Sequence, residues 1–181
     1  RELPDWKVLD AARRIAGNGS LGVPRFVLLV RDPEGQELLL DLKQAQRAVG
    51  LRANDWTQPD WVSDAERVAT VQSMMQVVPV AFLRPLEWRG ASWILRELLP
   101  QEDRVEVAQA TDREFEDFAR SLGALVAWSV LRASGRRGAA TADELAEFAP
   151  TKHWRGALAD LAWEVAERTR EQWEEFREAP L

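Results

Sequence analysis

The residues best suited to chemistry lie between Gly17 and Lys43. They form a glycine-containing loop followed by two strand-like runs, and the second run ends in the lysine. The loop consists of Gly17, Asn18, Gly19, Ser20, Leu21 and Gly22. Because glycine has no Cβ, its backbone reaches positive φ at little steric cost and its N–H group can approach a phosphate closely. The stretch therefore indicates a candidate phosphate-binding site.

The residues after the loop decide between the known kinds of phosphate loop. The dinucleotide-binding kind must open a helix, whereas residues 25–30 are rich in β-branched and aromatic side chains and predict a strand. The Walker A kind requires lysine and a hydroxyl directly after the last glycine, where this chain has Val23 and Pro24. The remaining kind is the protein-kinase arrangement, in which a glycine-rich hairpin covers the phosphates and a lysine on a following strand pairs with them.

Lys43 stands at the position that this arrangement requires. It ends the apolar run of residues 37–43, which a turn at residues 32–35 connects to the preceding strand. Pro24 departs from the kinase pattern, which has valine at this distance from the last glycine. A second interpretation stays open, in which the glycines form an ordinary connection and Lys43 is an exposed residue at a strand end. Residues 8–16 fit either a short helix or a strand.

The next segment predicts a helix over residues 63–75. Ser63 and Glu66 have the spacing of a capping box at its start. In the kinase interpretation Glu66 is the helix glutamate that forms an ion pair with Lys43. In the alternative it only satisfies backbone groups at the helix N-terminus.

Residues 78–83 and 92–99 predict two further strands, joined through residues 88–90. Together with the earlier strands they predict a small, mostly antiparallel sheet with one packed helix over residues 1–100. A kinase amino-terminal lobe contains these elements. The fold class expected for the chain is therefore α+β.

Residues 101–181 predict a helical region. Capping boxes of the type Thr-x-x-Glu start two helices, at Thr111 and at Thr141, and Pro150 ends the second. The last segment carries an apolar stripe at helical spacing and predicts a long amphipathic helix. Its stripe consists of Leu158, Leu161, Ala162, Val165, Thr169, Trp173 and Phe176.

Composition excludes several classes of function. The formal net charge is -6 and the basic residues form no long run, so the pattern is not that of a nucleic-acid binder. The chain has no cysteine and one histidine, His153, which excludes disulfides, cysteine-ligated metals and two-histidine zinc sites. No apolar stretch approaches the roughly 18 to 20 residues that span a bilayer. We therefore expect no membrane partner and a cytoplasmic location. An amino terminus without methionine suggests part of a longer protein.

Several segments of the first hundred residues resemble a bacterial family. They are residues 12–22, 42–45, 66–68, 72–76 and 93–98. On these segments the chain is similar to the proteins catalogued as domain of unknown function 2252, a family that resembles kinase-like and aminoglycoside-phosphotransferase-like folds. The similarity fades after Gly123, because members carry a His-Ala pair in the helix that here contains residues 125–132.

This resemblance implies a nucleotide-binding lobe that binds ATP and Mg²⁺. Gly17, Gly19 and Gly22, with Asn18 and Ser20 between them, would cover the phosphates. Lys43 would pair with the phosphates, and Glu66 would orient Lys43. Glu97, Leu98 and Leu99 would form the hinge whose backbone meets the adenine.

The resemblance also implies an incomplete active site. The catalytic Gly-Asp-x-His and Asp-Phe-Asp-like motifs of the family lie in a preceding amino-terminal half, and neither occurs here. No residue of this sequence is therefore assigned a catalytic role or a metal-ligating role. The expected partners are that missing half and a small-molecule or protein substrate. The alternative is a non-catalytic, pseudokinase-like interaction or scaffold domain.

Overall fold

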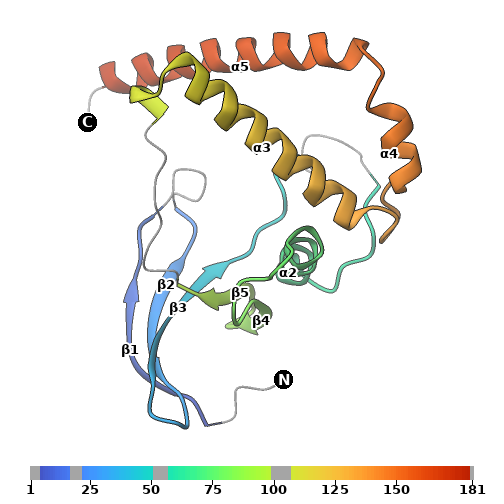
Figure 1. The fold of residues 1–181 in the computed structure, drawn as a ribbon. Helices are drawn as coiled ribbons and strands as arrows, with labels where there is room; N and C mark the ends of the chain where they lie inside the picture. Colours follow the sequence, from blue (N-terminus) through green and yellow to red (C-terminus); the bar gives the residue numbers. More distant parts are fainter. Residues whose placement is uncertain (1–4, 17–21, 51–56, 99–106, 180–181) are drawn as a thin grey trace. The chain divides into compact units, whose positions relative to one another are not determined.

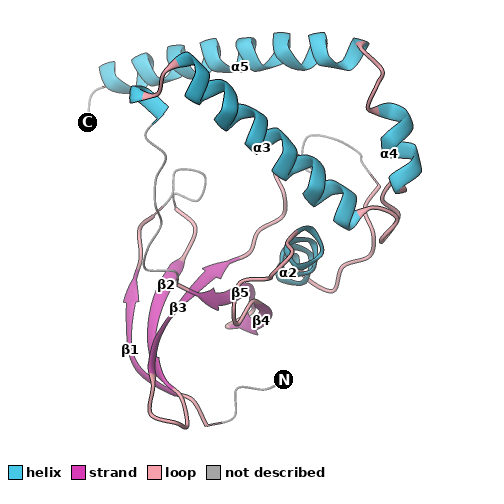
Figure 2. Cartoon of the chain, in the orientation of Figure 1, coloured by secondary structure: helices cyan, strands magenta, loops and turns pink. Residues whose placement is uncertain are grey.

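The computed structural model describes residues 5–16, 22–50, 57–98 and 107–179. Five strands and four α-helices lie in this part of the chain, so the expected α+β fold is confirmed (Figures 1 and 2). The elements are β1 (Lys7–Arg13), β2 (Arg25–Arg31), β3 (Glu37–Gln44), α2 (Asp64–Met75), β4 (Arg84–Trp88), β5 (Ala91–Glu97), the short 3-10 helix η2 (Val107–Gln109), α3 (Asp112–Ala133), α4 (Ala142–Phe148) and α5 (His153–Glu178). The chain divides into two compact units, residues 1–139 and residues 140–181. Each unit is described by itself.

The first unit is built on one sheet with the strand order β1-β2-β3-β5-β4. All neighbouring strands are antiparallel, and β3 occupies the centre. Arg25 pairs with Lys43 across β2 and β3, and Lys43 pairs in turn with Ile94 on β5. Two residues before Lys43 on β3, Asp41 pairs with Arg96 on β5. Residues paired directly across antiparallel strands share a face, so this register decides which side chains meet.

The two faces of the sheet differ in chemistry because successive strand residues point to opposite sides. One face carries the hydrophobic core, which consists of the buried residues Val30, Leu40, Leu42, Trp93 and Leu95. The other face carries Arg25, Asp41, Lys43 and Arg96. The one tryptophan among these five core residues is Trp93.

The structure resolves one open alternative and corrects one prediction. Residues 7–13 form a strand rather than a helix. The strand predicted over residues 78–83 is wrong, because the strand lies one segment later, at Arg84–Trp88. Phe82 has a positive φ of 60° and the N–H group of Leu83 bonds back to the carbonyl of Val80, which makes this segment a turn. Pro85 is tolerated within β4 because β4 is an edge strand.

A tight hairpin joins β4 to β5. Arg89 and Gly90 both have positive φ, 51° and 72°, as a two-residue type I′ turn requires. The turn sets the register in which Trp88 pairs with Ala91. The Trp93 indole N–H donates to the carbonyl of Trp88 at 3.0 Å and fixes the same corner.

Helix α2 packs against β4 and β5, and α3 packs against α2. Ala65 and Ala69 are the buried residues of α2, and the Ala65 N–H donates to the Ser92 hydroxyl of β5 at 3.2 Å. Small side chains on this side of the helix allow such a close approach to the sheet. The predicted capping box at Thr111 is confirmed at the start of α3. At the other end of α3, the Arg132 guanidinium donates to the carbonyl of Met75 at 3.3 Å.

The second unit contains α4 and α5. The capping box at Thr141 is confirmed, and so is the long helix predicted near the end of the chain. His153 is the first residue of α5. No helix in the described residues is long and apolar enough to cross a membrane.

Candidate anion-binding site

A small pocket lies on the polar face of the sheet, beneath α2. Its volume is about 190 Å³. Three strands and the helix provide its lining, which consists of Arg25, Asp41, Lys43, Val68, Gln72, Ile94 and Arg96. The cross-strand register brings the sheet residues together, and the i,i+4 spacing of Val68 and Gln72 places both on one side of α2. We call this the cationic pocket.

Asp41 is the anchor of the cationic pocket and is only 1% exposed. Its carboxylate accepts two hydrogen bonds from Arg25, at 2.6 Å from Nε and 2.7 Å from Nη2. It accepts a third from Nε of Arg96 at 3.3 Å, and Arg14 Nη1 lies 3.7 Å away. Burial alone would raise the pKa of Asp41, but the hydrogen bonds and positive charges of Arg25 and Arg96 outweigh it and hold the pKa below its ordinary value. Asp41 is therefore a buried carboxylate that stays charged.

Lys43 lies in the same pocket. Among the described residues, its ammonium group has no hydrogen bond and no ion pair. The pKa of Lys43 is lowered, first by burial and then by the charges of Arg25 and Arg96, while Asp41 opposes the shift. The pocket thus holds three cationic side chains and one carboxylate, in a protein whose overall charge is negative. Such a site attracts an anion.

The glycine loop connects β1 to β2, but most of it lies outside the described residues. This applies to Gly17, Asn18, Gly19 and Ser20. Gly22 is described and has a φ of +82°, which a side chain would strain. Arg25 follows it closely and pairs with Lys43, so the loop leads into the strand end that carries the cationic pocket. Pro24 does not interrupt the sheet, because its carbonyl accepts a hydrogen bond from the Gln44 N–H at 3.0 Å.

The structure does not bring Glu66 to Lys43. Oε2 of Glu66 accepts a hydrogen bond from the Val62 N–H at 2.7 Å, and its own N–H donates to the Ser63 hydroxyl at 3.1 Å. Oε1 lies 4.0 Å from the guanidinium of Arg137. Glu66 therefore serves the start of α2, as in the capping interpretation, and the polar side chain that α2 contributes to the pocket of Lys43 is Gln72.

The expected hinge residues are only partly described. The N–H groups of Glu97 and Leu98 donate to the carbonyls of Ala81 and Leu39, both at 2.8 Å. These two donors are thus occupied within the protein. Leu99 lies outside the described residues.

Four polar residues of the pocket were not identified from the sequence: Arg25, Asp41, Gln72 and Arg96. A signal existed for Asp41, because a charged residue inside the run Leu-Leu-Leu-Asp-Leu-Lys stands two positions before Lys43 and thus on its face. Another existed for Gln72, which stands well inside the predicted helix, where a partner for a strand lysine is expected. Arg25 and Arg96 required the sheet register, which the sequence does not provide.

The described residues contain no group of three or more histidine, aspartate or glutamate side chains that could hold a metal ion. Asp41, the carboxylate of the cationic pocket, is already bonded to arginines. The arrangement in this part of the chain is suited to binding an anion rather than a bare cation.

Comparison with known proteins gives one match. No curated protein and no solved structure matches the chain. A family model described as "Uncharacterized protein conserved in bacteria (DUF2252)" matches residues 1–179. Because this match covers almost the whole chain, the protein belongs to that bacterial family.

Proposed function

We propose that the chain binds the phosphate groups of a nucleotide in the cationic pocket. The observation that carries this proposal is the position of Lys43, whose ammonium group lies beside Arg25 and Arg96 and has no direct partner among the described residues. A bound phosphate would offset the mutual repulsion of these cations and would supply a hydrogen-bond acceptor for the lysine.

The arginines support this role because Asp41 holds them in place. Arg96 uses its Nε for Asp41, and within the described residues its terminal nitrogens make no hydrogen bond, so they are the groups that would contact a ligand. Fixing the donors before a ligand arrives lowers the entropy that binding must overcome. Asp41 thus acts as a positioning residue, and Lys43 and Arg96 as the groups that contact the anion.

The order of elements supports a nucleotide rather than an isolated phosphate. The glycine loop between β1 and β2, Lys43 on β3, and then α2, β4 and β5 follow each other as in the kinase arrangement of glycine loop, strand lysine and helix. Gly22 would allow the loop backbone to approach the outer phosphates.

Recognition of the base is expected to be weak. The N–H groups of Glu97 and Leu98 already bond to carbonyls of the protein, so these donors do not read the adenine. We propose that the affinity comes from the phosphates and that ATP and GTP bind similarly. Phosphoryl transfer would in addition need carboxylates that hold Mg²⁺, and these would come from outside this sequence.

Calorimetric titration tests the proposal with ATP, GTP, tripolyphosphate and adenosine, each with and without Mg²⁺. The three phosphate ligands should bind with similar affinity, and adenosine should not bind. Lys43→Gln should weaken the binding of the phosphate ligands by about tenfold or more, because a charge-assisted contact is lost.

Lys7→Gln is the matched control, because Lys7 is an exposed strand residue of the same sheet. This change should leave binding unaltered. Absence of saturable binding of any phosphate ligand would refute the proposal, as would an affinity that Lys43→Gln does not change.

A further inference from the structure

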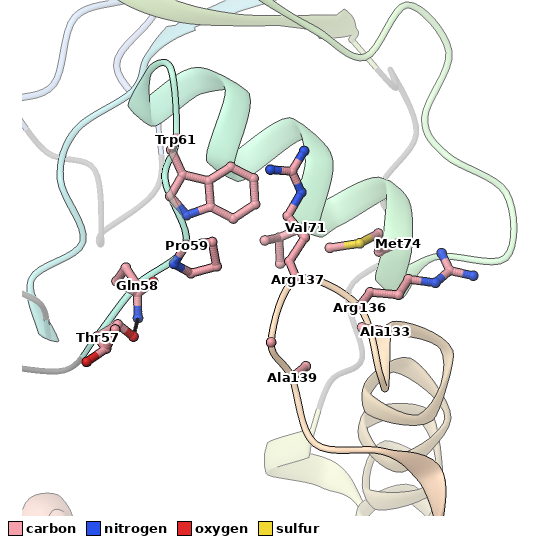
Figure 3. A pocket seen from close by; sticks show the side chains of 11 residues that line it. Thr57, Gln58, Pro59, Trp61, Val71, Met74, Ala133, Arg136, Arg137 and Ala139 are labelled. Carbon is pink, nitrogen blue, oxygen red and sulfur yellow. Dashed lines mark hydrogen bonds between the residues drawn. The ribbon is translucent and has the colours of Figure 1, made fainter.

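A second, larger cavity lies in the first unit, against another part of α2. Its volume is about 600 Å³, a size typical of small-molecule sites. Figure 3 shows the segment 57–61 on one side, the loop 136–139 that follows α3 on the other, and α2 above. Val71 and Met74 are the α2 residues that line it. We call it the Trp61 cavity, and only α2 is shared with the cationic pocket.

Most of the surface of the Trp61 cavity is apolar. Its apolar lining consists of Pro59, Trp61, Val71, Met74, Ala133 and Ala139. An indole ring and a methionine thioether together form an adaptable surface for an aromatic or branched aliphatic group. The cavity therefore suits a ligand whose larger part is apolar.

Two arginines give this apolar cavity a positive charge. The Arg137 guanidinium lies 4.6 Å from the centre of the Trp61 ring, which fixes it over the indole face. Among the described residues, the carboxylate within ion-pair range of this guanidinium is that of Glu66, whose Oε1 is 4.0 Å away, at the limit of an ion pair. Arg136 also lines the cavity and has no ion pair within the described residues. A ligand anion would complete the contacts of both guanidinium groups.

The Trp61 indole provides an independent sign of a ligand site. Its N–H group is buried and has no hydrogen-bond acceptor in the described part of the chain. A buried donor without an acceptor costs about 1–3 kcal/mol in a typical protein. An acceptor atom on a bound molecule would remove this cost.

We propose that the Trp61 cavity binds a small organic carboxylate, with an aromatic or branched aliphatic body. The body packs against Trp61, Val71 and Met74, and the carboxylate accepts hydrogen bonds from Arg137 and Arg136. A carboxylate fits better than a phosphate, because the second charge of a phosphate costs more to remove from water beside so much apolar surface. The site is independent of the nucleotide site proposed above.

Calorimetry with three probe acids tests the proposal: 1-naphthaleneacetate, indole-3-butyrate and 4-phenylbutyrate, each paired with its uncharged primary amide. At least one acid should bind with a Kd of about 1 mM or tighter, as expected for ligands of this size. Its amide should bind about tenfold more weakly, because the charge-assisted hydrogen bonds are lost. The indole N–H signal of Trp61, identified in nitrogen-15 NMR spectra by its loss in Trp61→Phe, should shift on binding.

The double variant Arg136→Gln/Arg137→Gln should lower the affinity for the acid about tenfold and leave the affinity for the amide unchanged. Arg113→Gln/Arg120→Gln removes the same charge from exposed positions of α3 and serves as the matched control. Three outcomes would overturn the proposal: no saturable binding of any of the three acids, equal affinities for an acid and its amide, or an affinity that the Arg136/Arg137 double variant does not change.

Discussion

Asp41 and Arg25 form a two-pronged ion pair inside the sheet, with oxygen to nitrogen distances of 2.6 Å and 2.7 Å. They come from neighbouring strands, and Asp41 is almost completely buried. Arg96 contributes from the opposite neighbour, β5. One carboxylate therefore connects the three central strands on the polar face and fixes the donors of the cationic pocket. A buried charge of this kind is costly to leave without its partner.

Asp41→Asn is expected to destabilise the protein by about 2–3 kcal/mol, because the arginines lose their counter-charge while they stay packed on the sheet. Urea denaturation followed by circular dichroism measures the free energy of unfolding. Glu37→Gln is the control, since it makes the same chemical change in the exposed Arg31–Glu37 pair on the same strands. This control should cost no more than about 0.5 kcal/mol. Equal effects of the two changes would contradict the anchoring role of Asp41.

The same ion pair gives a defined pH dependence. The pKa of Asp41 in the folded protein lies below the ordinary value of 3.8. Its contribution to stability is therefore fully present above that ordinary value and is lost as the pH falls through the lowered pKa. The difference in the free energy of unfolding between the wild type and Asp41→Asn should shrink in this acid range. If this difference stays constant down to about pH 2, the stability does not come from a charged Asp41 with a lowered pKa.

Lys43 is expected to cost stability in the absence of a ligand. Its pKa in the folded protein lies below the ordinary value of 10.5, so between the two values the unfolded chain binds more protons. The free energy of unfolding therefore rises with pH between the lowered pKa and 10.5. At lower pH the ammonium group of Lys43 is charged in the folded protein, and this charge opposes folding. Lys43→Gln should raise the free energy of unfolding by only about a few tenths of a kcal/mol, because solvent screens the charge of this partly exposed group, while it weakens phosphate binding. Destabilisation by Lys43→Gln, measured by urea denaturation at neutral pH, would indicate a structural role instead.

Phosphate binding should also depend on pH through Lys43. As the pH rises through the lowered pKa, the ammonium group loses its charge. The affinity for tripolyphosphate should therefore begin to decrease with rising pH before pH 10.5 is reached. In Lys43→Arg the charge persists at all these values, because a guanidinium has a pKa above about 12. Calorimetric titration over a series of alkaline pH values compares the two proteins. The same decline in both would assign the pH dependence to another group.

Local signals in the sequence predicted much of the fold. Thr111 pairs with Glu114, and Thr141 pairs with Glu144. In each pair the two residues are only three positions apart, and both capping boxes form as expected. The turn at residues 32–35 and the two strands around it also depend on neighbours in the chain. By contrast, the edge strand β4 was misplaced, because each of the two neighbouring segments contains a proline and the more apolar one, residues 78–83, resembles a strand more than Arg84–Trp88 does.

The candidate site was less predictable, because its contacts join distant parts of the chain. Lys43 was identified from its place at the end of an apolar strand, and the structure places it in a pocket. Asp41 and Arg96, however, are 55 residues apart and meet only through the pairing of β3 with β5. A shift of this register by one residue would turn Arg96 to the other face. Residue types and spacing alone do not fix that register.

The division of roles between Glu66 and Gln72 provides the last prediction. Glu66→Gln removes a negative charge from the first turn of α2. There the charge interacts favourably with the helix dipole, and the carboxylate accepts a hydrogen bond from the Val62 N–H. We expect a loss of about 0.5–1 kcal/mol in the free energy of unfolding and no change in phosphate affinity.

Gln72→Glu, unlike Glu66→Gln, should change the affinity for phosphate. It places a carboxylate beside Lys43 in the cationic pocket, so an ion pair forms where the phosphate is expected to bind. The affinity for tripolyphosphate should then fall about tenfold, and the lowered pKa of Lys43 should rise toward its ordinary value. Gln72→Leu serves as the uncharged control. If Glu66→Gln weakens phosphate binding and Gln72→Glu does not, then Glu66 rather than Gln72 acts on Lys43, and α2 must adopt a different position when the anion is bound.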